Sequence, residues 1–336
     1  MKEREIKKQF VWAVWGLVGL LGAFVCLKLF TPQPSIVTKA SPLVTAEGWI
    51  QNYGGYFWKD EKNILAFRSV QSGLQAISVD IETGKETSLA GLTKAFAKAK
   101  TGDVANWRLS SDGKRLLWRS RRINRQESLW SISDLDGKAL KSWRCRTSLS
   151  SPLWMPDTES WLEMKPSSGS DPIIHSIASK DTVLTTINSQ PSFAFSVSPD
   201  RKLISMNQPD RSGNFSWDEY SLTTAPVFVT TRDLRLPKGC DGIQEAEMSP
   251  DGKQIAILFT AIPTSTLENI VRRLLPNSGF ANQTHLQIWV FSRDGNQRHL
   301  IGAETGAAIS GVLWTLDSRQ VSFITHGKLF RISPEG

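Results

Sequence analysis

The sequence is poor in the residues from which many catalytic and metal sites are built. Its 336 residues include only 3 Cys, 4 His and 3 Tyr. Three cysteines cannot form a disulfide-rich scaffold, and four scattered histidines argue against a histidine metal centre. Charged residues make up 21% of the chain and apolar residues 40%. This balance is typical of a globular protein and excludes wholesale disorder.

Common catalytic motifs are absent as well. The chain has no Gly-x-Ser-x-Gly turn, no His-Glu-x-x-His, no Cys-x-x-Cys and no glycine-rich phosphate loop. We therefore assign no catalytic residue, metal ligand or cofactor, and we predict that the protein is not an enzyme. Cys145 and Cys240 are either bonded to each other or two free buried thiols, and the sequence leaves both alternatives open.

One long apolar run, Phe10–Leu27, lies near the N-terminus. Leu29 and Phe30 extend it beyond Lys28 to the length of about 20 residues that a membrane-spanning helix needs. We predict a basic cytoplasmic tail at residues 1–9, a transmembrane helix at 10–30 and a linker at 31–41. The positive tail places the N-terminus in the cytoplasm and the rest of the chain outside the membrane.

Several residues of this segment have expected roles. Trp12, Trp15 and Lys28 are expected at the membrane interfaces. A stripe of small residues would let a second helix pack closely, and it consists of Gly16, Gly19, Gly22 and Ala23. Glycine is also simply common in membrane helices, which is the alternative interpretation of the stripe. The alternative for the whole segment is a cleaved signal peptide, but no small-x-small cleavage site follows the run.

Six ten-residue segments align without gaps in the remainder of the chain. They are Trp58–Phe67, Leu109–Trp118, Trp154–Glu163, Val197–Met206, Met248–Ile257 and Trp314–Phe323, and their starts are 51, 45, 43, 51 and 66 residues apart. The first position is always apolar. The fourth position is always acidic, and it holds Glu61, Asp112, Asp157, Asp200, Asp251 and Asp317. We interpret the acid as structural, with its carboxylate accepting local backbone N–H groups of a turn.

Each segment predicts the end of an inner strand, a tight turn and a second strand with alternating apolar residues. Third and fourth strands follow most copies, for example Leu286–Phe291 and Gln297–Ile301. Four antiparallel strands at this period predict an all-β, six-bladed β-propeller over residues 42–336. The last repeat is too short for a fourth strand, so we expect the segment Ser35–Val44 to supply it and close the ring.

The amino-acid sequence of the repeats resembles that of the TolB-like propellers, which are relatives of the WD-repeat family. The residues that carry the resemblance are Ser198–Lys202, Ser249–Lys253 and Leu286–Ile301. It extends over nearly all of the chain outside the predicted anchor, and it implies the propeller fold. TolB has a separate N-terminal α/β domain where this chain has an anchor and a linker, so the partners of TolB are not transferred.

Two surfaces are candidates for docking. An insertion at residues 261–284 contains a predicted short helix whose apolar face consists of Leu267, Ile270, Val271, Leu274 and Leu275. This face either packs on its own blade or docks to a partner or the bilayer. A basic cluster between two strands of the second repeat consists of Arg119, Arg121, Arg122 and Arg125. It is either a solvated loop or a site for phosphate headgroups or an acidic partner.

Tryptophan is abundant, with 13 copies in the chain. Trp58, Trp154 and Trp314 occupy the first position of a repeat, where packing between blades is the expected role. Among the tryptophans outside the aligned segments, four are candidates for a recognition surface, and these are Trp49, Trp107, Trp143 and Trp217.

Together these patterns predict a non-catalytic scaffold subunit in a bacterial inner membrane. A single-pass anchor would hold the propeller in the periplasm, where it binds and stabilises a membrane protein complex and touches the lipid bilayer. The small-molecule ligand is unknown, and a nucleic-acid partner is not expected. The alternative is an extracytoplasmic enzyme or binder acting on glycans or peptides. That alternative forecasts a deep central cleft with converging acids whose pKa values are perturbed.

Overall fold

A computed structural model describes twelve ranges of the chain and the single residue Ala40. The ranges are 42–50, 55–71, 73–99, 107–122, 128–145, 152–163, 173–178, 182–183, 194–222, 227–261, 285–305 and 308–335. All of them belong to one compact unit. The predicted cytoplasmic tail, transmembrane helix and insertion helix lie outside these ranges. Within them, no helix has both the length and the apolar character required to cross a membrane.

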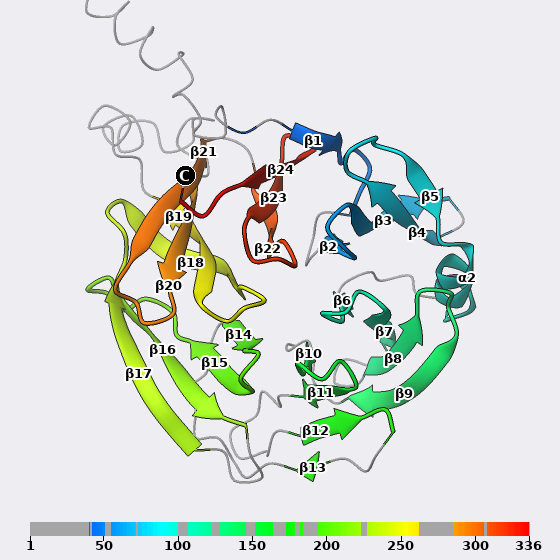
Figure 1. The fold of residues 1–336 in the computed structure, drawn as a ribbon, viewed down its shortest axis with the longest axis horizontal. Helices are drawn as coiled ribbons and strands as arrows, with labels where there is room; N and C mark the ends of the chain where they lie inside the picture. The colour runs from blue at the N-terminus through cyan, green and yellow to red at the C-terminus, as the bar shows by residue number, and fades with distance from the viewer. Residues whose placement is uncertain are drawn as a thin grey trace, which may run out of the picture. The chain divides into compact units, whose positions relative to one another are not determined.

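Six separate four-stranded antiparallel sheets form a ring, which we number as blades 1–6 in chain order (Figure 1). Blade 1 contains β2 (Tyr56–Trp58), β3 (Asn63–Val70), β4 (Gly73–Asp80) and β5 (Glu86–Ser88). Blade 2 contains β6 (Trp107–Leu109), β7 (Arg115–Arg122), β8 (Ser128–Asp134) and β9 (Ala139–Cys145). Blade 3 contains β10 (Leu153–Trp154), β11 (Ser160–Glu163), β12 (Ile173–Ser176) and β13 (Thr182–Val183).

The other three blades repeat this plan. Blade 4 contains β14 (Ala194–Val197), β15 (Lys202–Met206), β16 (Asn214–Ser221) and β17 (Val227–Arg235). Blade 5 contains β18 (Cys240–Met248), β19 (Gln254–Ala261), β20 (His285–Ser292) and β21 (Arg298–Thr305). Blade 6 contains β22 (Ser310–Trp314), β23 (Val321–Thr325), β24 (Lys328–Ile332) and β1 (Pro42–Thr45). The prediction of an all-β propeller with six four-stranded blades is confirmed.

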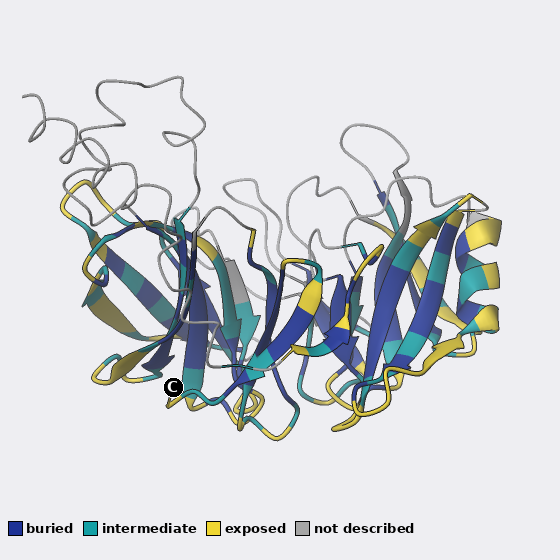
Figure 2. Cartoon of the chain, turned by 90° about the horizontal axis from the view of Figure 1, so that it is seen from above, coloured by how far each residue is buried: buried dark blue, intermediate teal, exposed yellow. Residues whose placement is uncertain are grey.

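The ten-residue repeat coincides with the inner hairpin of each blade. In all six copies, the first residue of the repeat is the last residue of the inner strand, as at Trp58 in β2 and Met248 in β18. The second strands are buried on both faces, and all five residues of β23 are buried. The outer strands are more exposed, as in β5. Burial therefore falls from the second strand of a blade toward its outer edge (Figure 2).

The ring is closed by a strand from the start of the domain. β1 pairs antiparallel with β24, with Pro42 opposite Phe330 and Thr45 opposite Lys328. The predicted pairing of this part of the chain with the last blade is confirmed, and the strand extends one residue beyond the predicted segment. Blade 6 thus joins both ends of the domain in one sheet, which leaves no unpaired edge at the junction.

Repeated tryptophans hold neighbouring blades together through their indole N–H groups. Trp154 Nε1 donates to the Arg108 carbonyl at 2.9 Å, and Trp314 Nε1 donates to the Glu247 carbonyl at 3.0 Å. In both cases the acceptor precedes the first repeat position of the preceding blade. Trp58 Nε1 instead donates to Ser322 Oγ of blade 6 at 2.8 Å. Their expected packing between blades is confirmed.

One helix was not anticipated from the sequence. α2 (Ala90–Ala99) follows blade 1 and packs against β4 and β7 (Figure 1). Phe96 is buried, with its ring 4.8 Å from that of Trp118 and 5.9 Å from that of Phe67. Gly91 lets the helix start touch a turn of blade 2, because a Cβ there would lie only 1.9 Å from the Asp136 carbonyl oxygen.

Candidate functional site

Most of the predicted docking residues lie outside the described part of the chain. This holds for the small-residue stripe, the interfacial Trp12, Trp15 and Lys28, and the insertion helix. In the basic cluster, Arg119 is half-buried on β7, and the backbones of Arg121 and Arg122 continue that strand. Arg125 lies outside the described residues. The structure therefore does not place these residues together as a site.

The repeated acids lie in the inner hairpin turns and bond within them. Asp112 Oδ1 accepts the Lys114 N–H at 3.1 Å, and Asp251 Oδ1 accepts the Lys253 N–H at 3.1 Å. Asp157 and Asp317 make the same bond to the residue two places on. The residue after the acid has a positive φ in five blades, and these residues are Gly113, Thr158, Arg201, Gly252 and Ser318.

Two blades depart from this pattern. In blade 1 the turn acid is Asp60 rather than Glu61, because Asp60 Oδ1 accepts the backbone N–H groups of Lys62 and Asn63 at 2.9 and 2.8 Å. The turn there is one residue shorter than in blade 2, since Trp58 pairs with Ile64 whereas Leu109 pairs with Leu116. A gapless alignment therefore selects the neighbouring acid.

In blade 4 the turn acid bridges to the next blade. Arg293, in the outer hairpin of blade 5, lies 3.0 Å from an Asp200 oxygen and 3.0 Å from Glu219 Oε2 of β16. Glu219 is almost fully buried, whereas Asp200 is half exposed. Although partial burial pushes the pKa of Asp200 upward, bonds from Ser198 and Arg293 hold that pKa well below its usual range. This ionic contact fastens blade 4 to blade 5.

Three of the four candidate tryptophans are part of the packed interior. Trp49, Trp107 and Trp217 are buried. Trp107 packs on Phe67 of blade 1 with a ring separation of 4.0 Å. Trp143, on the outer strand of blade 2, is only half-buried. Of the four, it alone offers indole surface to a recognition role.

Trp143 belongs to a cluster of aromatic and charged side chains between blades 2 and 3. Its Nε1 donates to Glu163 Oε2 at 3.2 Å, and the same oxygen lies 2.9 Å from His175 Nε2. Trp161 stacks on the His175 ring, with Lys141 Nζ 5.1 Å from the Trp161 ring centre. Because Glu163 and His175 are buried and bonded to each other, and Glu163 also accepts from Trp143, this cluster is a packed contact between blades 2 and 3.

Two carboxylates lie close together on β18, the inner strand of blade 5. Glu245 and Glu247 are half-buried on β18, two residues apart. Burial raises the pKa of both groups, and the nearby positive charge of Arg108 offsets part of that effect. Glu245 Oε2 also accepts the Val312 N–H of blade 6 at 3.0 Å. Perturbed acid pKa values are one of the features that the alternative function forecast, together with a deep central cleft.

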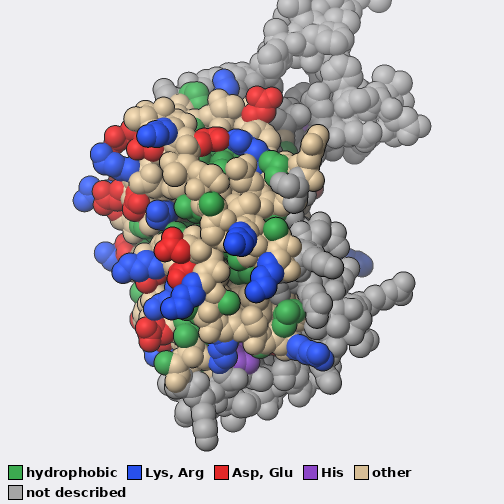
Figure 3. Space-filling model, turned by 90° about the vertical axis from the view of Figure 1, so that its right-hand side faces the viewer, with side chains coloured by type: hydrophobic (Ala, Val, Ile, Leu, Met, Phe, Trp, Pro, Cys, Tyr) green, Lys and Arg blue, Asp and Glu red, His purple; other side chains and the backbone are tan. Residues whose placement is uncertain are grey.

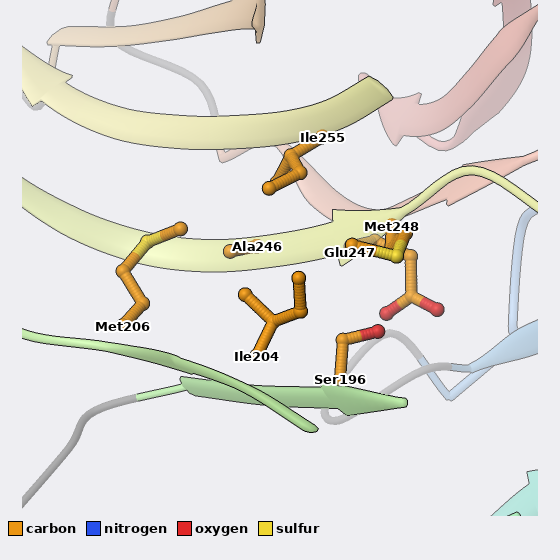
Figure 4. Close-up of a pocket in the computed structure, with 7 residues that line it drawn as sticks. All are labelled: Ser196, Ile204, Met206, Ala246, Glu247, Met248 and Ile255. Atoms are coloured by element: carbon orange, nitrogen blue, oxygen red, sulfur yellow. The ribbon is translucent and has the colours of Figure 1, made fainter. Parts of the chain in front are cut away.

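A small cavity lies beside Glu247, between blades 4 and 5 (Figure 4). The Glu247 carboxylate and the Ser196 hydroxyl point toward each other at one end of it. The rest of the wall is apolar and consists of Ile204, Met206, Ala246, Met248 and Ile255. The volume is about 10 Å³, which is enough for roughly one water molecule. The cavity is therefore too small for a substrate.

The outer edge of blade 4 carries exposed apolar side chains. Val227, Phe228 and Val229 are 60%, 53% and 44% exposed and begin β17. Among the described residues, Leu140 is the one other large hydrophobic side chain that is exposed. The surface over blades 1 and 2 differs, because Lys, Arg, Asp and Glu side chains are interspersed over it and apolar side chains appear there only as small separate spots (Figure 3).

Comparisons with known proteins give a few solved structures of limited similarity and no family. No protein-family model and no curated protein matches the sequence. A TolB structure from Agrobacterium tumefaciens is similar, with 13% identity, a TM-score of 0.49, and coverage of 84% of this chain and 89% of that one. TolB from Acinetobacter baumannii is 12% identical with a TM-score of 0.43, and the match covers 85% and 65% of the two chains.

An enzyme is among the similar structures as well. Hydrazine synthase from Kuenenia stuttgartiensis has 13% identity and a TM-score of 0.47, and the match covers 88% of this chain and 75% of that one. At such identities and TM-scores these likenesses say nothing about what this chain does. Function has to be argued from the residues of this chain.

The described residues also show whether a reactive thiol or a metal-binding cluster is present among them. Cys240 is a buried free thiol, and burial raises its pKa to about 12. It is therefore an inert thiol rather than a reactive one. No three His, Cys, Asp or Glu side chains in the described ranges are grouped so that they could hold a metal ion.

Proposed function

We propose that this protein is a binding subunit that holds a partner protein at the outer edge of blade 4. In this proposal residues 10–30 anchor the chain in a bacterial inner membrane, and the propeller stabilises a membrane protein complex on the periplasmic side. The observation that carries the proposal is the exposed apolar start of β17, which we call the docking edge and define as Val227–Arg235.

The docking edge has the features of a strand that accepts another strand. At nine residues it is the longest of the six outer strands, and its free side pairs with no strand that the structure describes. Unpaired N–H and C=O groups beside exposed apolar side chains are a template for strand addition. Natural edge strands usually avoid such a combination, so its presence favours a partner.

The charges on the docking edge indicate what the partner segment carries. Arg232 and Arg235 follow the apolar residues, and the exposed Arg298 of blade 5 donates to the Arg235 carbonyl at 2.9 Å. Asp233 is the one carboxylate on this strand, so its C-terminal half is basic. An antiparallel partner strand would therefore place acidic residues first and apolar residues after them.

The docking edge is tested by purifying the full chain in mild detergent after crosslinking. Wild type and the control Leu140→Lys should carry one partner in stoichiometric amount, identified by mass spectrometry. The double variant Val227→Lys with Phe228→Lys should lose that partner, because two charges replace its apolar contact. A wild-type chain that purifies alone as a single species would count heavily against the proposal.

The membrane placement is tested separately. An enzyme reporter that is active only in the periplasm, fused after Gly336, should be active in cells, and the chain should sediment with membranes. Deleting residues 10–30 should release it from the membrane fraction. If this fusion is inactive and a reporter that works only in the cytoplasm is active at the same position, the C-terminus lies in the cytoplasm and the proposed topology is wrong.

The second candidate, a channel that binds or acts on glycans or peptides, is favoured by Glu245 and Glu247. Purified protein would be offered fluorogenic peptides and glycans. Turnover that disappears in the Glu245→Gln, Glu247→Gln double variant would support an enzyme. Turnover that survives in this variant, or no turnover by wild type, would contradict it.

A further inference from the structure

The two faces of the docking edge carry different side chains. The register of β16 and β17 places Thr231 opposite Asp218 and Arg232 opposite Trp217. Residues opposite each other in a sheet share a face and successive residues alternate, so Thr231 and Arg232 point to opposite sides of blade 4. Trp217 packs against Phe291 of blade 5, with ring centres 6.3 Å apart. Arg232 therefore lies on the face toward blade 5, and Thr231 lies on the face toward blade 3.

A bulge brings an aromatic side chain onto the face toward blade 3. The pairing shifts between Glu219 and Tyr220, so Val229 has no residue opposite it. This extra residue lets Phe228 point to the same face as Thr231. There the Phe228 ring packs edge-on against Tyr220, with ring centres 5.8 Å apart. Tyr220 is buried in a cluster that includes core residues of blade 3, so the exposed Phe228 ring rests on the packed interior.

Two carboxylates on this face lack a cationic partner. Asp218 is half-buried on β16, and its Oδ1 accepts the Thr231 hydroxyl at 2.7 Å. Asp233 is exposed and lies two residues after Thr231, which places it on the same face. Neither carboxylate forms an ion pair with any residue that the structure describes. The face ends at Arg235, so a partner would meet one positive charge and then two negative charges.

We propose that the docking edge binds an extended segment of a partner protein in which acidic and basic residues alternate ahead of apolar ones. This inference rests on the proposed function and specifies the partner that the docking edge accepts. The backbone of the segment pairs with β17, its basic side chains lie on the face toward blade 3, and an acidic side chain lies toward Arg232. In strand addition of this kind the main chain supplies affinity, and alternate side chains supply specificity.

The spacing between strands lets one partner residue reach Asp218. Neighbouring strands lie about 4.8 Å apart, so a Lys or Arg opposite Thr231 is long enough to extend over it to the carboxylate. The apolar stem of that side chain would lie beside Phe228, and Asp233 would flank its charge. An acidic residue at the same position would bring like charges together and weaken binding.

The test offers two peptides with blocked ends to the full chain in detergent. The probe has the sequence Glu-Thr-Lys-Glu-Lys-Val-Val-Val. Paired antiparallel from Arg235, it places its lysines opposite Asp233 and Thr231 and its second glutamate opposite Arg232. The control peptide has glutamine in place of both lysines. Fluorescence anisotropy of the labelled peptides at low salt should show that wild type binds the lysine peptide at least tenfold more tightly.

Substitutions in the protein test which groups cause this preference. The double variant Asp218→Asn with Asp233→Asn should bind the lysine peptide at least tenfold more weakly and the glutamine peptide as wild type does. The new amide oxygen at the first position still accepts the Thr231 hydroxyl, so the strand pair is kept. Asp136→Asn, in an exposed turn of blade 2, should change neither affinity. Circular dichroism and thermal melts verify that each variant is folded.

The outcomes separate this inference from the docking edge itself. If both peptides bind wild type equally and Val227→Lys with Phe228→Lys abolishes both, the edge accepts a strand and the inference about charge is wrong. The inference is also wrong if the double aspartate variant keeps the preference for lysine. If neither peptide binds wild type, strand addition at the docking edge fails as well. A wild-type dimer that the Val227→Lys, Phe228→Lys variant dissociates would make a second copy the occupant and overturn the inference.

Discussion

At the scale of single residues, one buried hydroxyl joins the first and last blades. Ser322 on β23 is fully buried. Its Oγ lies 2.8 Å from both Trp58 Nε1 and Tyr56 Oη, and it donates to the Leu313 carbonyl at 3.1 Å. Burial also raises the pKa of Tyr56 far above its usual range, so the phenol stays protonated and able to donate. A small side chain thus serves three partners at the closure of the ring.

Replacing this hydroxyl should cost more than its size suggests. Ser322→Ala leaves the Trp58 indole N–H buried without an acceptor, so we expect the free energy of unfolding to fall by about 1–3 kcal/mol. Urea denaturation followed by circular dichroism measures the change. The exposed Ser69→Ala serves as the control and should stay within about 0.5 kcal/mol of wild type. Equal effects of the two substitutions would contradict this role.

The contact of Asp200 with Arg293 should make stability depend on acid. The folded-state pKa of Asp200 is lowered below its unfolded value. Its contribution is therefore fully present above the unfolded pKa of about 3.9 and is lost as pH falls toward the folded pKa. Asp200→Asn should be less stable than wild type at pH 6, and the difference should shrink below about pH 4.

This dependence is measured by urea melts from pH 6 to pH 2.5. Because Asp200 is half exposed, solvent screens the contact, and the effect should be modest. Asp136→Asn, in an exposed turn of blade 2, provides the matched control. A difference between wild type and Asp200→Asn that stays constant over the whole pH range would show that the ionised contact does not contribute.

At the scale of elements, the short strand β1 closes the ring with its backbone and packs one of its faces into the core. Val44 is buried among core residues that include Ile324 and Leu329, whereas its neighbour Thr45 is exposed. Successive strand residues point to opposite faces. Four residues therefore contribute both a set of backbone pairs to β24 and one apolar anchor to the core.

Adjacent substitutions in β1 should have very different effects. Val44→Asp buries a carboxylate without a partner, and we expect a loss of about 3 kcal/mol or more in the free energy of unfolding. Thr45→Asp places the same charge in solvent and should cost less than about 1 kcal/mol. Thermal melts of the two variants measure the two losses of stability. Similar losses would mean that β1 does not close the ring in solution.

At the scale of the whole molecule, the inner strands form an uninterrupted chain of neighbours. β22 contacts both β18 and β2, so the last blade touches the fifth and the first. Each blade buries its faces against two others, and none has a core of its own. Closure should therefore make the blades depend on one another for stability.

We expect the ring to unfold in one cooperative step. Tryptophan fluorescence reports on the contacts between blades, and far-ultraviolet circular dichroism reports on the strands, so the two transitions should coincide. Ser322→Ala should shift both midpoints equally, although it lies at a single junction. Two separated transitions, or a shift in fluorescence alone, would indicate blades that unfold independently.

The sequence by itself determined the number of blades, their inner hairpins and the closing strand. These features are local or periodic, because turn acids, alternating strands and a missing fourth strand can all be recognised within a few residues. It misplaced the turn acid in blade 1, where a one-residue shorter hairpin moves the role from Glu61 to Asp60. It also missed α2, whose short helix depends on Phe96 packing against Phe67 and Trp118.

Only the tertiary structure decided which side chains meet. Trp58 reaches Ser322, and Arg293 reaches Asp200, although each pair is far apart in the chain. The exposure of Val227, Phe228 and Val229 likewise follows from the position of β17 outside every other strand of its blade. The physical reason is that a repeat specifies its own hairpin through local bonds, whereas contacts across the ring arise only when all six blades close.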